Sequence, residues 1–464
     1  DGNVYNTAVG HAAGNNVTTG LRNTLIGGLA GDAITTASDN VAVGKGALTS
    51  DTTGADNTAV GSASLGANTT GASNTGLGYG ALNANTTASN NTAVGASALV
   101  ANTTGAEGVA VGMSALAANT TGNYGVAVGT YALDANTTGD NNIAIGRSAL
   151  GVNTTGASNT AVGTFSLDAN TTAANNTAVG YSALTANTTG AQNTSVGMNA
   201  LYGNTTGTDN TGIGQGALQS NTTASNNTAV GKAALSVNTT GGNNTAVGKG
   251  ALDANTTAVS NTAVGAACLT TNTTGASNVA MGVSALEGNT TGDQNVAFGN
   301  NSLGANTTAD NNTAVGHNSL VANTTGTSNT AVGYGSGLNV TTGIQNTIVG
   351  VSAGAISTGA NNTAIGIFSS GGAVSTGNNN TGLGYATLYE VTSGSNNTAI
   401  GMDAGRAGSP SGSITTGSNI IVLGDDAVAN AHIQVDWTVA SDARDKTDFT
   451  ALDLGLDFVK ALAP

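Results

Sequence analysis

The stretch from Asn57 to Ser73, NTAVGSASLGANTTGAS, is one copy of a repeat that fills most of the chain. Its apolar-glycine pair occurs with glycine at position 10 and then at every seventeenth residue up to Gly350, without insertion or deletion. Glycines at 366, 384, 401 and 424 continue the series at less regular steps. A fixed step means that each unit performs the same geometric operation, so the sequence predicts a repeat architecture rather than several separate domains.

Each unit contains two short apolar segments, Thr-Ala-Val and Ala-Leu in most copies, and turn residues bound both of them. Seventeen residues are too few for a helix pair or a propeller blade, and the many Gly and Asn residues disfavour helix. One unit is therefore predicted to form one coil of an all-β, parallel β-solenoid or β-roll. Successive coils would pair as parallel strands about 4.8 Å apart, which gives the shaft a length of roughly 120 Å.

The first segment places a large residue beside a small one, and neighbouring residues of a strand point to opposite faces. The Val position is apolar in every unit, as at Ile145, Met281 and Phe298, whereas the position before it is mostly Ala, Gly or Ser. We expect the large residue to fill the coil interior and the Ala face to pack against another chain. One coil buries too little apolar surface to offset the ordering of its backbone, so association of chains around a shared axis is expected.

The turns of the unit are as regular as its strands. Asn-Thr-Thr-Gly recurs almost unchanged, and a second column of Asn precedes the strands, broken by Gly108 and Gly125. Asn and Gly tolerate the left-handed conformations of tight corners. Stacked Asn side chains are expected to hydrogen-bond from coil to coil as ladders.

Composition excludes several classes of function. The formal charge of −15 argues against binding to nucleic acid and against docking on an anionic membrane. The single cysteine, Cys268, excludes an internal disulfide and a cysteine-based zinc site. The three histidines are too dispersed to ligate a metal, so we expect no metal. No run of 18 apolar residues is present, so we expect no membrane insertion. We also expect no cofactor.

The residue directly after the repeated glycine varies freely beside constant neighbours, which marks an outward-facing column. One interpretation is ordinary exposed surface. The other is a multivalent contact surface for a host receptor or glycan. Under the second interpretation the candidate binding residues are the tyrosines of this column, Tyr79, Tyr181, Tyr334 and Tyr385.

The repeat ends at Gly424, and residues 441–464 read SDARDKTDFTALDLGLDFVKALAP. The pattern of Ser441, Asp442, Arg444 and Lys446 resembles the start of the intramolecular chaperone domain of endosialidase-type phage tail fibres. That resemblance implies a domain that drives trimerisation and then cuts itself off. Ser441 would be the nucleophile and Lys446 its base, with cleavage between Ser441 and Asp442.

The repeats are also similar to the head repeats of trimeric autotransporter adhesins and to those of tail-fibre-like proteins, which again implies a homotrimer. We therefore expect a shaft at 1–424, a connector at 425–440 and the start of a chaperone domain at 441–464, within a longer gene product. The predicted function is a structural or adhesive virion fibre that is extracellular and projects toward a host cell surface. The alternatives are a bacterial surface adhesin and an ice-binding solenoid. No enzyme activity is expected beyond the single self-cleavage.

Overall fold

The computed structural model describes residues 5–356, 358–372 and 374–430, and these form strands and turns without a helix. Each of the 25 strands is three residues long and ends directly before a glycine of the repeat series. The strands are β1 (Thr7–Val9), β2 (Thr24–Ile26), β3 (Val41–Val43), β4 (Thr58–Val60), β5 (Thr75–Leu77), β6 (Thr92–Val94), β7 (Val109–Val111), β8 (Val126–Val128), β9 (Ile143–Ile145), β10 (Thr160–Val162), β11 (Thr177–Val179), β12 (Thr194–Val196), β13 (Thr211–Ile213), β14 (Thr228–Val230), β15 (Thr245–Val247), β16 (Thr262–Val264), β17 (Val279–Met281), β18 (Val296–Phe298), β19 (Thr313–Val315), β20 (Thr330–Val332), β21 (Thr347–Val349), β22 (Thr363–Ile365), β23 (Thr381–Leu383), β24 (Thr398–Ile400) and β25 (Ile421–Leu423).

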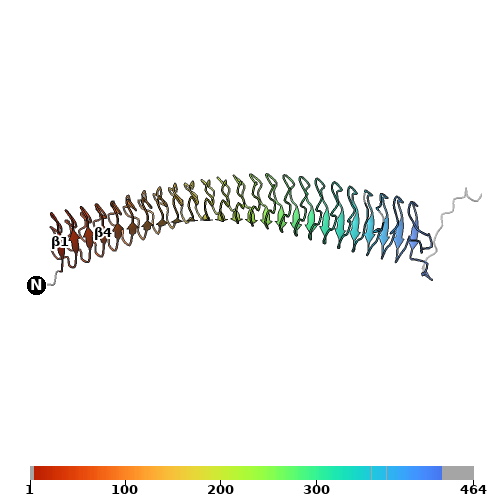
Figure 1. Cartoon of the computed structure of the whole chain (residues 1–464), viewed down its shortest axis with the longest axis horizontal. Helices are drawn as coiled ribbons and strands as arrows, with labels where there is room; N and C mark the ends of the chain where they lie inside the picture. The colour runs from red at the N-terminus through yellow and green to blue at the C-terminus, as the bar shows by residue number, and fades with distance from the viewer. Residues whose placement is uncertain (1–4, 357, 373, 431–464) are drawn as a thin grey trace, which may run out of the picture. The chain divides into compact units, whose positions relative to one another are not determined.

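Every strand pairs in parallel with the strand of the next coil, residue for residue, as Thr92–Val94 pairs with Val109–Val111. The pairing runs from β1 and β2 to β24 and β25, so all the strands belong to one sheet. Figure 1 shows the coils following one another in a single row with their strands along one side. The predicted all-β, parallel β-solenoid with 17-residue coils is therefore confirmed.

The small middle residue of each strand, and not the large third residue, points into the coil. Ala93 is completely buried, whereas Thr92 and Val94 on either side of it are only half-buried. The prediction that Val fills the interior is therefore wrong, and so is the prediction that the Ala face is free to pack against another chain. The room at this position depends on the neighbouring side chains, and a Cβ added at the equivalent Gly76 would lie 2.5 Å from Ser64 Oγ.

Leucine of the second segment fills the interior instead. This column runs through every coil from Leu48 to Leu320, and each of its side chains is buried. Its backbone is left-handed, as at Leu99 with φ of 51°, a conformation that costs an L-residue roughly 1–2 kcal/mol. Burial of the side chain contributes about 1.5–3 kcal/mol, which offsets that cost.

At two interruptions of the leucine column, a nearby middle strand residue is large. Leu25 packs beside Gly31 and Gly14, and a Cβ at either glycine would lie 2.7 Å from a Leu25 methyl carbon. Near the other end, Ile348 fills the same space beside Gly354 and Gly337. The two positions therefore share one interior volume, and close packing holds their combined size nearly constant.

The glycine after each strand is fixed by the approach of neighbouring coils. Gly61 has φ of +135°, and a Cβ there would lie 2.4 Å from the carbonyl oxygen of Gly78 in the next coil. Only glycine fits such a backbone contact without strain. This contact explains why the series of glycines survives even where the repeat step changes.

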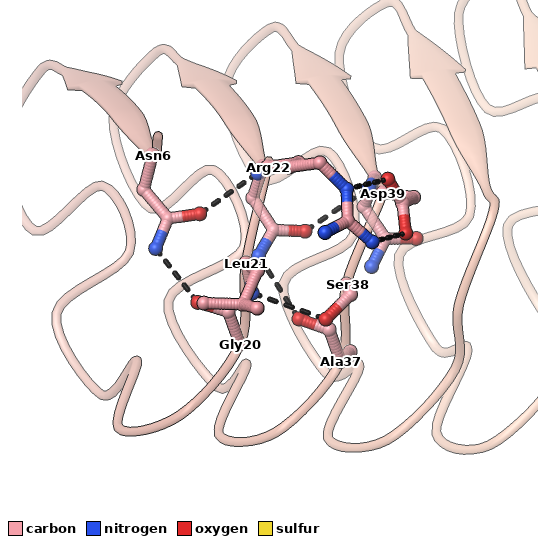
Figure 2. Close-up of polar contacts among 9 residues, drawn as sticks. Asn6, Gly20, Leu21, Arg22, Ala37, Ser38 and Asp39 are labelled. Carbon is pink, nitrogen blue, oxygen red and sulfur yellow. Dashed lines mark hydrogen bonds and ion pairs between the residues drawn. The ribbon is translucent and has the colours of Figure 1, made fainter. Parts of the chain in front are cut away.

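Two ladders of asparagine side chains link the coils at the corners. In the first, which runs from Asn68 to Asn323, each amide nitrogen donates to the amide oxygen of the preceding coil, as Asn85 Nδ2 donates to Asn68 Oδ1 at 2.8 Å. In the second, the amide oxygen accepts the backbone N–H of the next Asn, as Asn6 Oδ1 accepts from Asn23 N at 2.8 Å. Figure 2 shows this second ladder, in which Asn6 Nδ2 also donates to the carbonyl of Gly20. The predicted ladders are thus present and satisfy buried polar groups.

Candidate functional site

The outward side of the sheet forms a continuous surface along the solenoid, and we call it the strand face. It consists of the first and third residues of strands β1–β25. The first residue is Thr, Val or Ile and the third is Val, Ile, Leu, Met or Phe, so no charged or amide side chain interrupts the strand face. The third residues range from half-buried, as at Val94, to 49% exposed at Phe298 within the regular coils. A polar solvent-facing side is the usual pattern for a sheet that is covered on one face only.

The tyrosine column predicted from the sequence is exposed but dispersed. Tyr79, Tyr181, Tyr334 and Tyr385 all lie directly after the strand glycine with about half or more of their surface accessible. Many coils separate them, so the structure does not bring the four into one site. Each of the last three instead has an aromatic neighbour one coil away, as Tyr334 stacks on His317 at 5.3 Å between ring centroids.

The aromatic contacts become denser near the end of the solenoid. Phe368 meets Tyr385 edge to face with 6.2 Å between ring centroids, and it meets Tyr389 in the same way at 6.4 Å. The guanidinium of Arg406 lies over the Tyr389 ring at 4.9 Å, which is a cation–π distance. Phe368, Tyr389 and Arg406 were not predicted from the sequence, although the longer step from Gly401 to Gly424 marks the region.

A buried carboxyl lies at one end of the first asparagine ladder. Asp51 occupies the ladder position, and its Oδ1 accepts hydrogen bonds from Asn68 Nδ2 at 3.0 Å and from Gly54 N at 3.1 Å. Its Oδ2 has no hydrogen-bond partner and the preceding coil offers Ile34 at this position. Burial raises the pKa of the Asp51 carboxyl to about 7. The sequence shows Asp51 replacing Asn in the column, and that replacement was the available signal.

The remaining candidates carry little chemistry. Cys268 is buried, its thiol donates to the carbonyl of Ala280 at 3.2 Å, and burial raises its pKa to about 12. Among the described residues no group of three His, Cys, Asp or Glu side chains is placed to hold a metal ion. Ser441 and Lys446, proposed for self-cleavage, lie outside the described residues.

Charged side chains are sparse and mostly form local contacts. Arg22 forms a two-pronged ion pair with Asp39 of the next coil at 2.6 Å (Figure 2), and the hydrogen bond from Arg22 lowers the pKa of the Asp39 carboxyl.

Within the part of the chain that the structure describes, no helix is long and apolar enough to cross a membrane. The chain matches no protein-family model, and no curated protein sequence is similar to it. Functional inference therefore depends on the surfaces described above.

Proposed function

We infer that the chain is a structural, fibre-like protein, because every coil of the repetitive β-solenoid extends the molecule by the same increment. We propose that the chain is the shaft of a homotrimeric fibre, specifically a tail-fibre-like virion appendage that projects toward a host cell surface. The resemblance of residues 441–464 to a phage chaperone domain and of the repeats to trimeric adhesin heads supports this choice. A bacterial surface adhesin would use the same shaft.

The strand face is the observation that carries the proposal of association. Three residues span about 10 Å along a strand, and 25 coils span roughly 120 Å, so the strand face covers on the order of 1,200 Å² per chain. Stable protein interfaces bury about 800 Å² on each partner. The strand face therefore exceeds the area of one standard contact, and two neighbouring chains that share it would each cover about 600 Å². Burial of its aliphatic side chains would stabilise these contacts. The contact is made by Val and Thr rather than by the Ala residues that the sequence indicated.

The mass of the purified chain in solution tests this proposal, and light scattering measures it directly. A trimer of the 44.2 kDa chain is expected. Val230→Lys together with Val247→Lys introduces charge into two adjacent coils of the strand face and should dissociate the particle. Met198→Lys together with Gln215→Lys is the matched control, since it adds the same charge in two adjacent coils of the column after the strand glycine, where Lys232 and Lys249 already stand. A folded particle of one-chain mass for the unmodified protein would refute the proposal.

The strand face also bears on the ice-binding alternative. Its most frequent outward pair is Thr and Val, as at Thr160 and Val162 of β10, so it presents a regular row of hydroxyl and methyl groups. Self-association would cover this row and ice binding would require it to be free. A one-chain particle with thermal hysteresis would therefore favour the ice-binding solenoid, whereas a trimer without hysteresis would exclude it.

A further inference from the structure

The column after the strand glycine changes character in the last coils. Following β20 to β24 it holds five consecutive exposed apolar residues, namely Tyr334, Val351, Ile367, Tyr385 and Met402. In the earlier coils the same column mixes Lys, Arg, Thr, Ser, Gln and Asn with runs of at most three apolar residues. A contiguous exposed apolar area with polar residues around it is typical of an interaction surface.

Three rings at this corner hold one another in place. Phe368 contacts both Tyr385 and Tyr389 edge to face, at interplanar angles of 83° and 90°. The Tyr389 ring lies directly on the backbone of Gly372, where a Cβ would approach its ring carbons to 2.1 Å. Phe368 and Tyr385 keep 37% and 48% of their surface accessible. Two supported rings are thus presented to solvent in fixed positions, which lowers the entropic cost of binding a ligand.

Polar groups and an insertion border these rings. Arg406 stands one coil beyond Tyr389 at the same coil position, and its Nη1 lies 2.5 Å from Asp403 Oδ1. Arg406 directly precedes the extra residues that lengthen this coil, and Ser409 N donates back to its carbonyl at 2.9 Å. Glu390 accepts a hydrogen bond from Ser413 on the far side of the insertion. Insertions into a repeat form loops on one face, and that face is often the binding face.

We propose that this corner, which we call the aromatic patch and define by Tyr334, Phe368, Tyr385, Tyr389 and Arg406, binds a neutral oligosaccharide. Sugar rings present C–H faces that stack on exposed aromatic rings, and their hydroxyl groups exchange hydrogen bonds with arginine and carboxylate side chains. The inference deepens the proposed role at a host surface and rests on it, because it names the chemical class of the surface ligand.

Charge and size favour this ligand over others. The chain has a formal charge of −15, and the cation of the aromatic patch, Arg406, is already paired with Asp403, so an acidic glycan would be repelled. Two exposed rings offer far less than the roughly 800 Å² that a protein partner needs. Three coil steps separate Tyr334 from Tyr385, about 14 Å at 4.8 Å per step, which matches a short oligosaccharide lying along the solenoid.

The test uses the full chain on an array of immobilised short glucose-, galactose- and mannose-based oligosaccharides, with sialylated and uronic acid chains alongside. We expect binding to neutral members. Tyr385→Ala and Phe368→Ala should each weaken it about tenfold, the loss of roughly one aromatic contact. Tyr385→Phe, which keeps the ring, should retain binding.

Tyr181→Ala is the matched control, because Tyr181 makes the same edge-to-face contact with Phe165, at 6.3 Å, outside the aromatic patch. Equal losses in the control and patch variants would overturn the proposal, as would binding confined to acidic chains or no binding to any neutral member. The mass of each sample by light scattering separates the two proposals. A trimer that binds no neutral sugar refutes only the aromatic patch, whereas a one-chain particle refutes the trimeric shaft.

Discussion

Replacing Asp51 by Asn should stabilise the N-terminal coils, and the gain should depend on pH. Asp51 is buried at the position where the following coils carry the Asn ladder, and its Oδ2 lacks a partner. In each ladder Asn the corresponding nitrogen donates to a carbonyl three residues on, as Asn68 Nδ2 does to Gly71 O at 2.9 Å. Asn at position 51 would make the equivalent bond to Gly54 and would remove the buried charge.

The expected size of the stabilisation by Asp51→Asn follows from the pKa of the Asp51 carboxyl. Asp51 has a pKa of about 7 in the folded chain against 3.8 as the ordinary value. The folded state therefore binds the proton more tightly than the unfolded state, so stability falls as the pH rises between these values and then stays level. At about 1.4 kcal/mol per pKa unit, the raised pKa of Asp51 lowers the free energy of unfolding by about 4 kcal/mol at pH 8 and by about 2 kcal/mol at pH 5, relative to a neutral side chain. The advantage of Asp51→Asn should shrink by that difference between the two pH values.

Hydrogen exchange is the suitable measurement, because coils near the end of a solenoid open locally. The Thr52 amide, which donates to Thr69 O at 2.9 Å, reports on this corner. Its exchange free energy at pH 8 and pH 5 is compared between the native chain and Asp51→Asn after correction for intrinsic rates. Asp56→Asn, a change at an exposed carboxyl of the same coil, is the control and should leave protection unchanged. The reasoning fails if Asp51→Asn gives the same gain at both pH values or no gain at pH 8.

Three further changes test the interior and the corners. Leu184→Ala removes a fully buried side chain and should destabilise the chain by about 2–5 kcal/mol, measured by urea unfolding; a loss below about 1 kcal/mol would contradict the assigned core. Ala93→Leu should lower the free energy of unfolding by about 1–3 kcal/mol, because it overpacks the interior. Adding Leu82→Gly and Leu99→Gly should recover part of this loss, because glycine stands at the same positions beside Leu25. Strictly additive losses would contradict the shared interior volume. Gly61→Ala should lower the melting temperature measured by circular dichroism, because its Cβ would clash with the backbone of Gly78. Gly46→Asn should leave the melting temperature nearly unchanged, because Gly46 has a left-handed φ of +66° and open space around it.

The coil and its length could be predicted from the sequence, because the constant glycine step translates directly into a constant structural step. The Asn ladders could also be predicted, since the same residue at the same position of a solenoid must stack. The orientation of the strand could not be settled in this way. Alternation shows that the two faces of Thr-Ala-Val differ, but both faces are apolar, and nothing in one isolated unit says which is inside. The exchange of size between Leu25 and Gly31 was the informative signal, because only residues that share the interior compensate for each other.

The regularity of the strand face leaves the register between associated chains weakly fixed. Thr and Val recur in nearly every coil, so one chain shifted by a whole coil against another would still match apolar residues with apolar residues, and the strand face alone fixes register weakly. The departures from the repeat are concentrated at one end, where the glycine steps are irregular between Gly350 and Gly424 and the aromatic patch lies. A shift of one coil would misalign these coils while leaving the rest of the shaft matched. Selection of register would therefore fall to this end of the shaft.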